Sequence, residues 1–222
     1  MKRILTLLFC VIAIAANAQQ FRYGFSIAPG KNWLITEGDL YDQPNEKFSA
    51  FQYGLILDQT IGKGEYIAFT LGLNLNYSQS GLSSTNNNNA GDDKVWAIRA
   101  RYIEIPLTLR LRTPQLGSLR IYGEGGISYG KCYRAVGDYT LNGLRLDSDI
   151  DYIGKDNPNG LNYLEKNAGI QMGAGTEIKV SEGASILIGF YYQKGLMNVY
   201  EDNSTDLDIF LNQAGIRIAG LF

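Results

Sequence analysis

An alternation of apolar and polar residues runs along the chain from Ile67 to Tyr77. Every second residue is large and apolar, and the residues between are Ala, Thr, Gly and Asn. A period of two is typical of a β-strand with one apolar and one polar face. Its length of about eleven residues exceeds that of an average strand and suits a tilted strand that crosses a bilayer.

The same alternation recurs in seven further segments, so the sequence predicts eight strands. The other seven are residues 21–28, 51–58, 103–112, 119–129, 168–180, 185–193 and 213–222. Long connections (30–49, 79–94, 131–163, 196–206) alternate with short ones (62–64, 113–118, 181–183). In an up-and-down barrel this order places all long connections at one end, as in outer-membrane barrels. We therefore predict an all-β fold, an eight-stranded antiparallel up-and-down transmembrane β-barrel with both termini in the periplasm.

The composition of the polar face indicates which face meets lipid. A soluble eight-stranded barrel, such as a lipocalin, would expose a polar face rich in Lys, Glu and Thr. Here that face is mostly Gly, Ala, Ser, Asn and Gln with few charges of both signs, which suits a crowded interior. Aromatic residues on the apolar face near strand ends resemble interfacial girdles: Phe21, Phe51, Tyr53, Tyr77, Tyr129, Tyr192 and Phe222. We expect the apolar face to contact lipid; a soluble barrel is the alternative.

Charged residues on the polar face are predicted to pair inside the barrel. An eight-stranded barrel has an interior just wide enough for side chains to fill it, which favours a structural network over a channel lining. Arg22 is one such inward charge. The predicted network consists of Glu104, Arg110, Arg112, Arg120, Glu124, Glu177, Lys179 and Arg217. A narrow conduit for ions or small solutes is the alternative.

The first residues have the features of a targeting segment. Lys2 and Arg3 precede an apolar run (4–15) and a small-residue cleavage signal (16–18), so residues 1–18 are predicted to be a cleaved signal peptide. The barrel domain would then span 19–222 and be exported to the cell outer membrane. Loss of Lys2 and Arg3 takes the formal net charge from −2 to about −4, and no basic patch suggests nucleic acid. Cys132 alone would remain, because Cys10 lies in the leader, so no intramolecular disulfide is possible.

The chain contains no histidine, which excludes Ser-His-Asp and Cys-His catalysis and imidazole metal ligands. Cys132 therefore has no histidine to activate it and is interpreted as a spare thiol at the outer end of the fifth strand. Glu104 and Glu124 could in principle act as an acid–base pair, but the nearby arginines favour two ionised, paired carboxylates. We expect no enzymatic activity and no cofactor.

One long connection contains the spacing of a calcium loop at Asp147, Asp149 and Asp151. Tyr152 stands at the sixth position, where Gly is needed, and Pro158 at the twelfth, where Glu is needed. A solvated acidic loop is therefore the favoured interpretation. Loose bridging of divalent cations near lipopolysaccharide is the alternative.

Short motifs in the middle of the chain resemble a known family. Residues 102–107 (Tyr-Ile-Glu-Ile-Pro-Leu), with Arg110, resemble the Y-[LI]-E-[IL]-P segment of small outer-membrane barrels of Bacteroidota, the "porin family" or PorT-like barrels. Residues 122–126, 192–196 and 215–222 resemble the following strand and the last hairpin of that family. The terminal Phe222 resembles the signal read by the barrel-assembly machinery.

The resemblance implies an outer-membrane barrel over nearly the whole mature chain. The expected function is that of a non-enzymatic integral outer-membrane protein whose long loops bind a surface partner, or which has a structural role in the envelope. One member type of the family is linked to type IX secretion, so a component of a secretion machine is an alternative, as is a narrow channel. Expected partners are outer-membrane lipid, lipopolysaccharide, the barrel-assembly machinery and a secretion-complex or surface protein.

Overall fold

The computed structural model describes residues 20–37, 48–62, 64–85, 93–153, 161–202 and 208–222. The predicted signal peptide lies outside these residues. The described chain forms eleven strands: β1 (Gln20–Glu37), β2 (Phe48–Ile61), β3 (Ile67–Thr85), β4 (Asp93–Arg112), β5 (Leu119–Leu141), β6 (Leu144–Asp151), β7 (Leu161–Tyr163), β8 (Lys166–Lys179), β9 (Ser185–Gly195), β10 (Tyr200–Asp202) and β11 (Asp208–Leu221). In this part of the chain no helix is long and apolar enough to cross a membrane.

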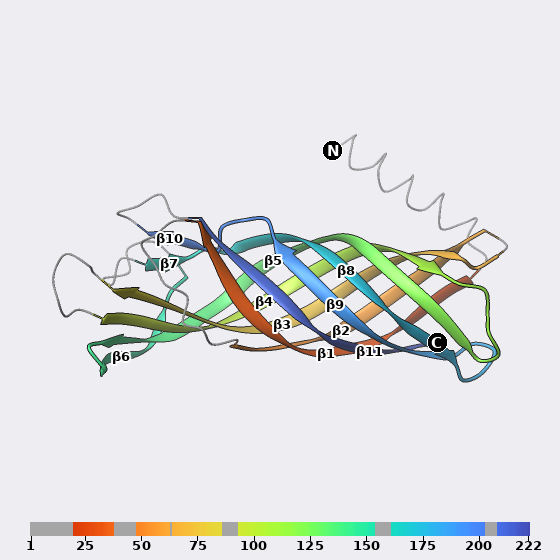
Figure 1. The fold of residues 1–222 in the computed structure, drawn as a ribbon, viewed down its shortest axis with the longest axis horizontal. Coiled ribbons are helices and arrows are strands. Elements are labelled where there is room, and N and C mark those ends of the chain that lie inside the picture. Colours follow the sequence, from red (N-terminus) through yellow and green to blue (C-terminus); the bar gives the residue numbers. More distant parts are fainter. Residues whose placement is uncertain (1–19, 38–47, 63, 86–92, 154–160, 203–207) are drawn as a thin grey trace.

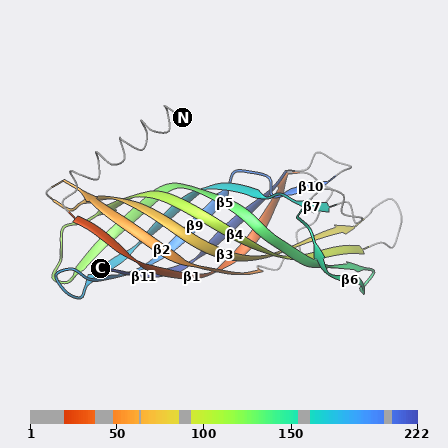
Figure 2. The same cartoon turned by 180° about the vertical axis from the view of Figure 1, so that it is seen from behind.

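Eight of the strands close into an antiparallel barrel in the order β1-β2-β3-β4-β5-β8-β9-β11, and β11 pairs with β1. Each barrel strand thus pairs with its neighbour in the chain order, which confirms the predicted fold class. The barrel is elongated, with β6, β7 and β10 at one end and the C-terminus at the other (Figures 1 and 2). We call these the loop end and the turn end, because the short connections between β2 and β3, β4 and β5, and β8 and β9 lie at the second.

The pairing register determines how the barrel closes. A row of paired residues that starts at Phe21 returns to β1 at Lys31, ten residues further along the strand. The strands are therefore staggered and tilted relative to the barrel axis. The row passes through Phe21, Gln59, Phe69, Leu109, Gly125, Met172, Tyr192, Ala214 and Lys31.

The two faces of each strand divide as the alternation predicts. Leu71 and Leu73 point outward and are 42% and 49% exposed, whereas Asn74 and Asn76 are buried in the lumen. From Phe21 to Pro29 on β1, and over the corresponding part of the other seven barrel strands, the outward positions carry no charged residue. This apolar band has the composition of a surface that contacts hydrocarbon.

Several strands are longer than predicted at the loop end. β3 and β4 extend into the predicted polar loop 79–94, and β5 runs to Leu141, where a turn at Asn142 and Gly143 leads back into β6. Both turn residues have positive φ, as a tight two-residue hairpin turn requires. The predicted boundaries were wrong here because the outward apolar pattern ends with the bilayer, whereas the hydrogen-bonded ladder continues into water.

Polarity inverts where these extensions begin. Within the band the inward positions of β4 are polar, for example Glu104 and Thr108, but beyond it they are Tyr102, Ile98 and Trp96, all buried. The outward positions change in the opposite sense, from Ile103 to basic residues. The extensions thus have an apolar inside and a polar outside, as expected for a protein segment in water.

A charged residue on the outward face should lower the free energy of unfolding within the apolar band and change it little beyond the band. Leu73→Arg is expected to lower the free energy of unfolding by about 2–4 kcal/mol, the range for Arg near the bilayer midplane. Val95→Arg, at an exposed outward position of the β4 extension, should change it by at most about 1 kcal/mol. Denaturant unfolding in phospholipid vesicles measures both, and equal effects would contradict the assignment of the band.

Candidate functional site: a filled lumen beneath an outer cap

Asp58 is the centre of an ion-pair network in the turn-end half of the lumen. Its side chain is fully buried, and its Oδ2 lies 2.8 Å from Arg22 Nη2 while its Oδ1 lies 2.9 Å from Arg110 Nη1. Arg112 also donates to Oδ2, and the Thr70 hydroxyl donates to Oδ1 at 2.9 Å. The register explains the cluster, because Asp58 faces Arg22 on β1 and Thr70 on β3.

Two further carboxylates complete this network. Glu124 lies 2.8 Å from Arg110 Nη2 and 2.5 Å from Arg217 Nη1. Glu177 lies 2.6 Å from Arg22 Nη1 and 2.9 Å from Arg112 Nε. Each charge therefore has an opposite charge in contact, which offsets the cost of removing it from water. We call the set Arg22, Asp58, Arg110, Arg112, Glu124, Glu177 and Arg217 the arginine network.

Tyrosine rings fill the space around the network. The guanidinium of Arg110 lies 5.0 Å from the centre of the Tyr122 ring, and that of Arg217 lies 5.2 Å from the centre of the Tyr191 ring, both within cation–π range. Gly189 makes room for one of these rings, since a Cβ at that position would come within 2.5 Å of the Tyr122 hydroxyl. Aromatic packing and ion pairs together fill this half of the lumen.

The structure brings together five members of the predicted network: Arg110, Arg112, Glu124, Glu177 and Arg217. Glu104 lies apart from them in a cluster of amides, where it accepts from Gln193 Nε2 at 2.5 Å and from Asn76 Nδ2 at 3.2 Å. Arg120 pairs with Glu65 at 2.6 Å near the turn-end mouth, and Lys179 is exposed there.

Arg22 and Asp58 belong to the network but were not among its predicted members. Both stand at polar positions of their alternating segments, so the period of two places them inside the barrel. Their contact follows only from the β1–β2 register, which pairs them directly. Distances in sequence of up to 155 residues within the network, as between Arg22 and Glu177, explain why residue type alone did not identify it.

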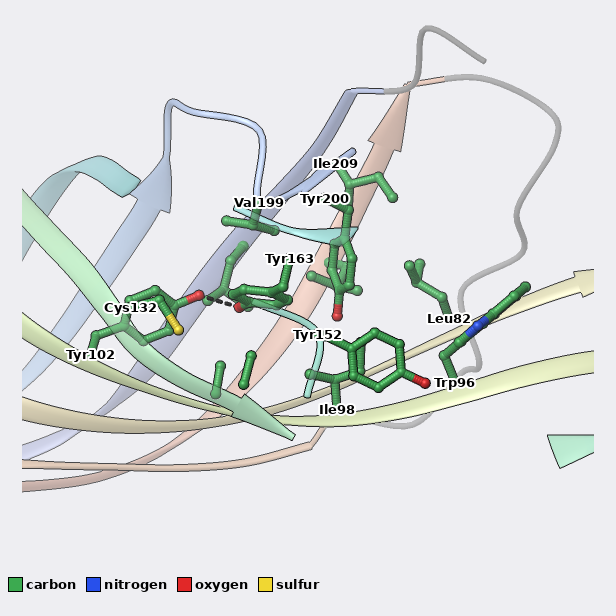
Figure 3. Packing of buried hydrophobic residues seen from close by; sticks show 14 of the residues in the cluster. Leu82, Trp96, Ile98, Tyr102, Cys132, Tyr152, Tyr163, Val199, Tyr200 and Ile209 are labelled. Atoms are coloured by element: carbon green, nitrogen blue, oxygen red, sulfur yellow. Dashed lines mark hydrogen bonds between the residues drawn. The ribbon is translucent and has the colours of Figure 1, made fainter. Parts of the chain in front are cut away.

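An apolar cluster closes the loop end of the lumen (Figure 3). Its tyrosines interlock: the Tyr102 and Tyr163 hydroxyls are hydrogen-bonded, and the Tyr163 and Tyr200 rings meet edge to face with centres 4.8 Å apart. The Ser80 and Tyr200 hydroxyl oxygens are 2.7 Å apart. We call this cluster the cap: Leu34, Leu82, Trp96, Ile98, Ala100, Tyr102, Cys132, Ala135, Tyr139, Tyr152, Tyr163, Val199, Tyr200, Ile209 and Leu211.

Backbone hydrogen bonds tie the long connections across the mouth. β7 and β10 pair with each other, with Tyr163 opposite Tyr200. Leu164 N donates to Val199 O at 2.9 Å, and Cys132 N donates to Glu165 O at 2.6 Å. Burial raises the pKa of Tyr163 and of Tyr200 well above the usual value for tyrosine, so both stay neutral in the cap. The predicted loops 131–163 and 196–206 therefore contain strands that cover the lumen.

Cys132 lies inside the cap and not at the end of its strand. The residue is 1% exposed, and Sγ donates to the Arg134 carbonyl at 3.3 Å. Burial raises the pKa of the thiol to about 11, which disfavours the reactive thiolate. The structure thus gives Cys132 a packing role.

The remaining predicted positions lie at the two ends of the barrel. Asp147, Asp149 and Asp151 fall on β6, where the side chains of the first two are outside the described residues and Asp151 Oδ1 accepts from Ile153 N at 3.0 Å. No three His, Cys, Asp or Glu side chains in the described part of the chain could together hold a metal ion. Phe222 points outward at the turn end, and its backbone pairs with Tyr23.

Cavities in the described lumen are small. One of about 20 Å³ lies beside Asn74 and Arg217, and another of about 50 Å³ lies at the turn-end mouth beside Arg120. The first is large enough for about one water, and small-molecule sites are typically several hundred Å³. The lumen is thus filled by the arginine network, the amide cluster around Glu104 and the cap.

Loss of the central carboxylate should strongly destabilise the barrel. Asp58→Asn is expected to lower the free energy of unfolding by about 3–5 kcal/mol, because the buried Arg110 and Arg112 and the partly buried Arg22 lose an anionic partner. Glu165→Gln is the control, since Glu165 and Lys131 are an exposed pair 3.3 Å apart, and should cost less than about 1 kcal/mol. Denaturant unfolding in vesicles measures both, and similar small effects would show that the network contributes little to stability.

Several solved structures are similar to this chain at low sequence identity. Neisserial surface protein A is 10% identical, with a TM-score of 0.45 over 90% of this chain and 95% of that chain. Outer membrane protein OprG from Pseudomonas aeruginosa is 13% identical, with a TM-score of 0.45 over 90% and 94%. Ail, the attachment invasion locus protein of Yersinia pestis, solved in complex with the heparin analogue sucrose octasulfate, is 10% identical, with a TM-score of 0.37 over 92% and 100%.

No curated protein matches the sequence. A family of outer-membrane proteins does match it, over residues 17–201, which is most of the chain and includes the arginine-network residues up to Glu177. The closed antiparallel barrel, the uncharged outward band and the filled lumen agree with that match. The chain belongs to the outer membrane protein beta-barrel domain family.

Proposed function

We propose that this protein is a closed, non-enzymatic barrel of the outer membrane, and that its long connections bind a partner at the cell surface or serve a structural role in the envelope. The observation that carries the proposal is the filled lumen, with the arginine network at one end and the cap at the other. The cavities of about 20 and 50 Å³ in the described lumen are too small for a ligand, which supports action through the outer surfaces.

The β5–β6 hairpin supports a role in binding. Leu144 and Leu146 on β6 are 70% and 53% exposed beyond the apolar band. Apolar side chains gathered on a water-facing surface are typical of interaction sites. The hairpin is held to the barrel by the pairing of β5 with β4, so these side chains stand on a fixed support.

The two alternatives from the sequence have less support. A narrow channel needs a continuous polar path, and the apolar cap lies across the loop-end mouth. A role in a secretion machine, like the PorT-like assignment, rests on sequence resemblance, and a stable copurified secretion complex would favour it.

The closed lumen should prevent ion conduction. In planar bilayers the folded protein is expected to show no discrete current steps, because side chains occupy the barrel cross-section. A steady unit conductance that changes in Glu104→Gln would instead favour the channel, since Glu104 lies in the middle of the lumen.

Function at the loop end can be separated from function in the lumen by complementation. In a strain that lacks the protein, Leu144→Ser/Leu146→Ser is expected to fail to restore resistance of the envelope to detergent. Glu104→Gln, which alters the lumen and leaves the hairpin intact, should restore it. Heat-modifiable gel migration verifies that both variants fold. Restoration by the hairpin variant and not by the lumen variant would contradict the proposal.

A further inference from the structure

Basic residues mark the loop-end edge of the apolar band. On five of the eight barrel strands, the first charged residue that points outward beyond the apolar run is Lys or Arg. On the other three strands the corresponding positions are Ser49, Gln79 and Asn212, which are uncharged. We call the five residues the basic collar: Lys31 on β1, Arg101 on β4, Lys131 on β5, Lys166 on β8 and Lys194 on β9.

The register places the collar at one level around the barrel. Lys131 faces Lys166 across the β5–β8 pair, and Arg101 faces Arg134 across the β4–β5 pair. Lys31 is the residue at which the row of paired residues that starts at Phe21 returns to β1, and it pairs with Ala214 of β11. At the turn end, no described strand ends its apolar run with an outward Lys or Arg. The positive charge is therefore specific to one edge of the band.

Aromatic rings lie beside the collar. The Arg101 guanidinium lies 5.3 Å from the centre of the Tyr77 ring, which stacks on Tyr53 with centres 6.0 Å apart. Trp33 on β1 stacks on Tyr192 of β9, also with centres 6.0 Å apart. Aromatic rings beside basic side chains are typical of the boundary between hydrocarbon and headgroups.

An apolar groove on the outward surface leads up to Lys31. It has a volume of about 620 Å³, and its floor contains the small residues Ala174 and Ala214. Larger side chains stand along it, among them Met172, Phe190, Tyr192 and Ile216, and Lys31 with Trp33 lies at its upper end. The Phe190 side chain is 74% exposed and therefore projects outward along one side of the groove. The groove has the shape and chemistry for one hydrocarbon chain beneath a phosphate at Lys31.

We propose that the loop-end edge of this barrel binds the phosphorylated lipid anchor of lipopolysaccharide, with its phosphates on the basic collar and one acyl chain in the groove below Lys31. Charge complementarity supports this occupant, because the collar is basic in a chain whose formal net charge is −2. Among the described residues, the exposed Lys131–Glu165 pair is the only ion pair that a collar residue makes, and it contributes little. Lipid binding here is independent of the role proposed for the hairpin.

Native mass spectrometry with matched lipids tests the phosphate part. The folded protein is presented with equal amounts of diphosphorylated lipid A and the same lipid A after enzymatic dephosphorylation. We expect at least tenfold preferential retention of the phosphorylated form, since each Lys or Arg near a charged lipid surface adds about a fivefold preference. Lys31→Gln/Lys194→Gln should remove most of this preference. Lys179→Gln, a matched neutralisation at the turn end, should leave it unchanged.

The groove and the source of the phosphate are tested separately. Ala214→Phe, which fills the groove floor on the lipid-facing surface, should lower retention of lipid A at least fivefold, while excess inorganic phosphate should not displace it. The proposal would be overturned if the two lipid A forms were retained equally or if inorganic phosphate displaced lipid A fully. It would also be overturned if Lys179→Gln had the same effect as Lys31→Gln/Lys194→Gln. Lys31, Lys194 and Ala214 point outward, and Lys179 is exposed at the turn-end mouth. Heat-modifiable migration verifies folding of each variant.

Discussion

The absence of water in a bilayer core is the constraint on which the structure depends. Each strand in the core must pair its backbone groups on both sides, because an unpaired N–H or C=O there costs several kcal/mol. The β1–β11 pairing meets this requirement by closing the sheet. Closure then encloses a narrow interior, which the inward side chains must fill without leaving buried charges alone. The arginine network is the solution that this chain adopts, with Asp58 shared by three arginines.

The same barrel strands pass from the lipid bilayer into water. On β4, residues from Ile103 to Leu111 turn apolar side chains outward, and residues from Tyr102 back to Trp96 turn them inward. The irregular pairing between Arg101 and Tyr102 lies where the two regimes meet. The outward side becomes basic at that level, and the inward side becomes the cap. Both faces of the barrel therefore change polarity at the same level, which marks the edge of the membrane.

This arrangement supports the proposal that function lies on the outer surfaces and not in the lumen. Ion pairs hold the turn-end half, amides surround Glu104 in the middle, and tyrosines close the loop end. What remains available is the outside: the exposed hairpin in water, and the collar with its groove at the lipid boundary. Family membership defines the barrel and the outer membrane, and the specific partners are proposed from these surfaces.

The sequence by itself determined the eight barrel strands, their antiparallel order and the direction of each face. A period of two places Leu73 and Asn74 on opposite sides of their strand. The composition of the polar face then predicts that Leu73 faces lipid and Asn74 the lumen. Tertiary structure decided which charges meet, because Arg22 and Glu177 are joined only when the barrel closes. It also decided that Tyr102, Tyr163 and Tyr200 form a cap over the lumen. Tyr163 and Tyr200 come from predicted connections, and Tyr102 directly precedes the predicted strand 103–112. Their contacts depend on register and on long-range packing.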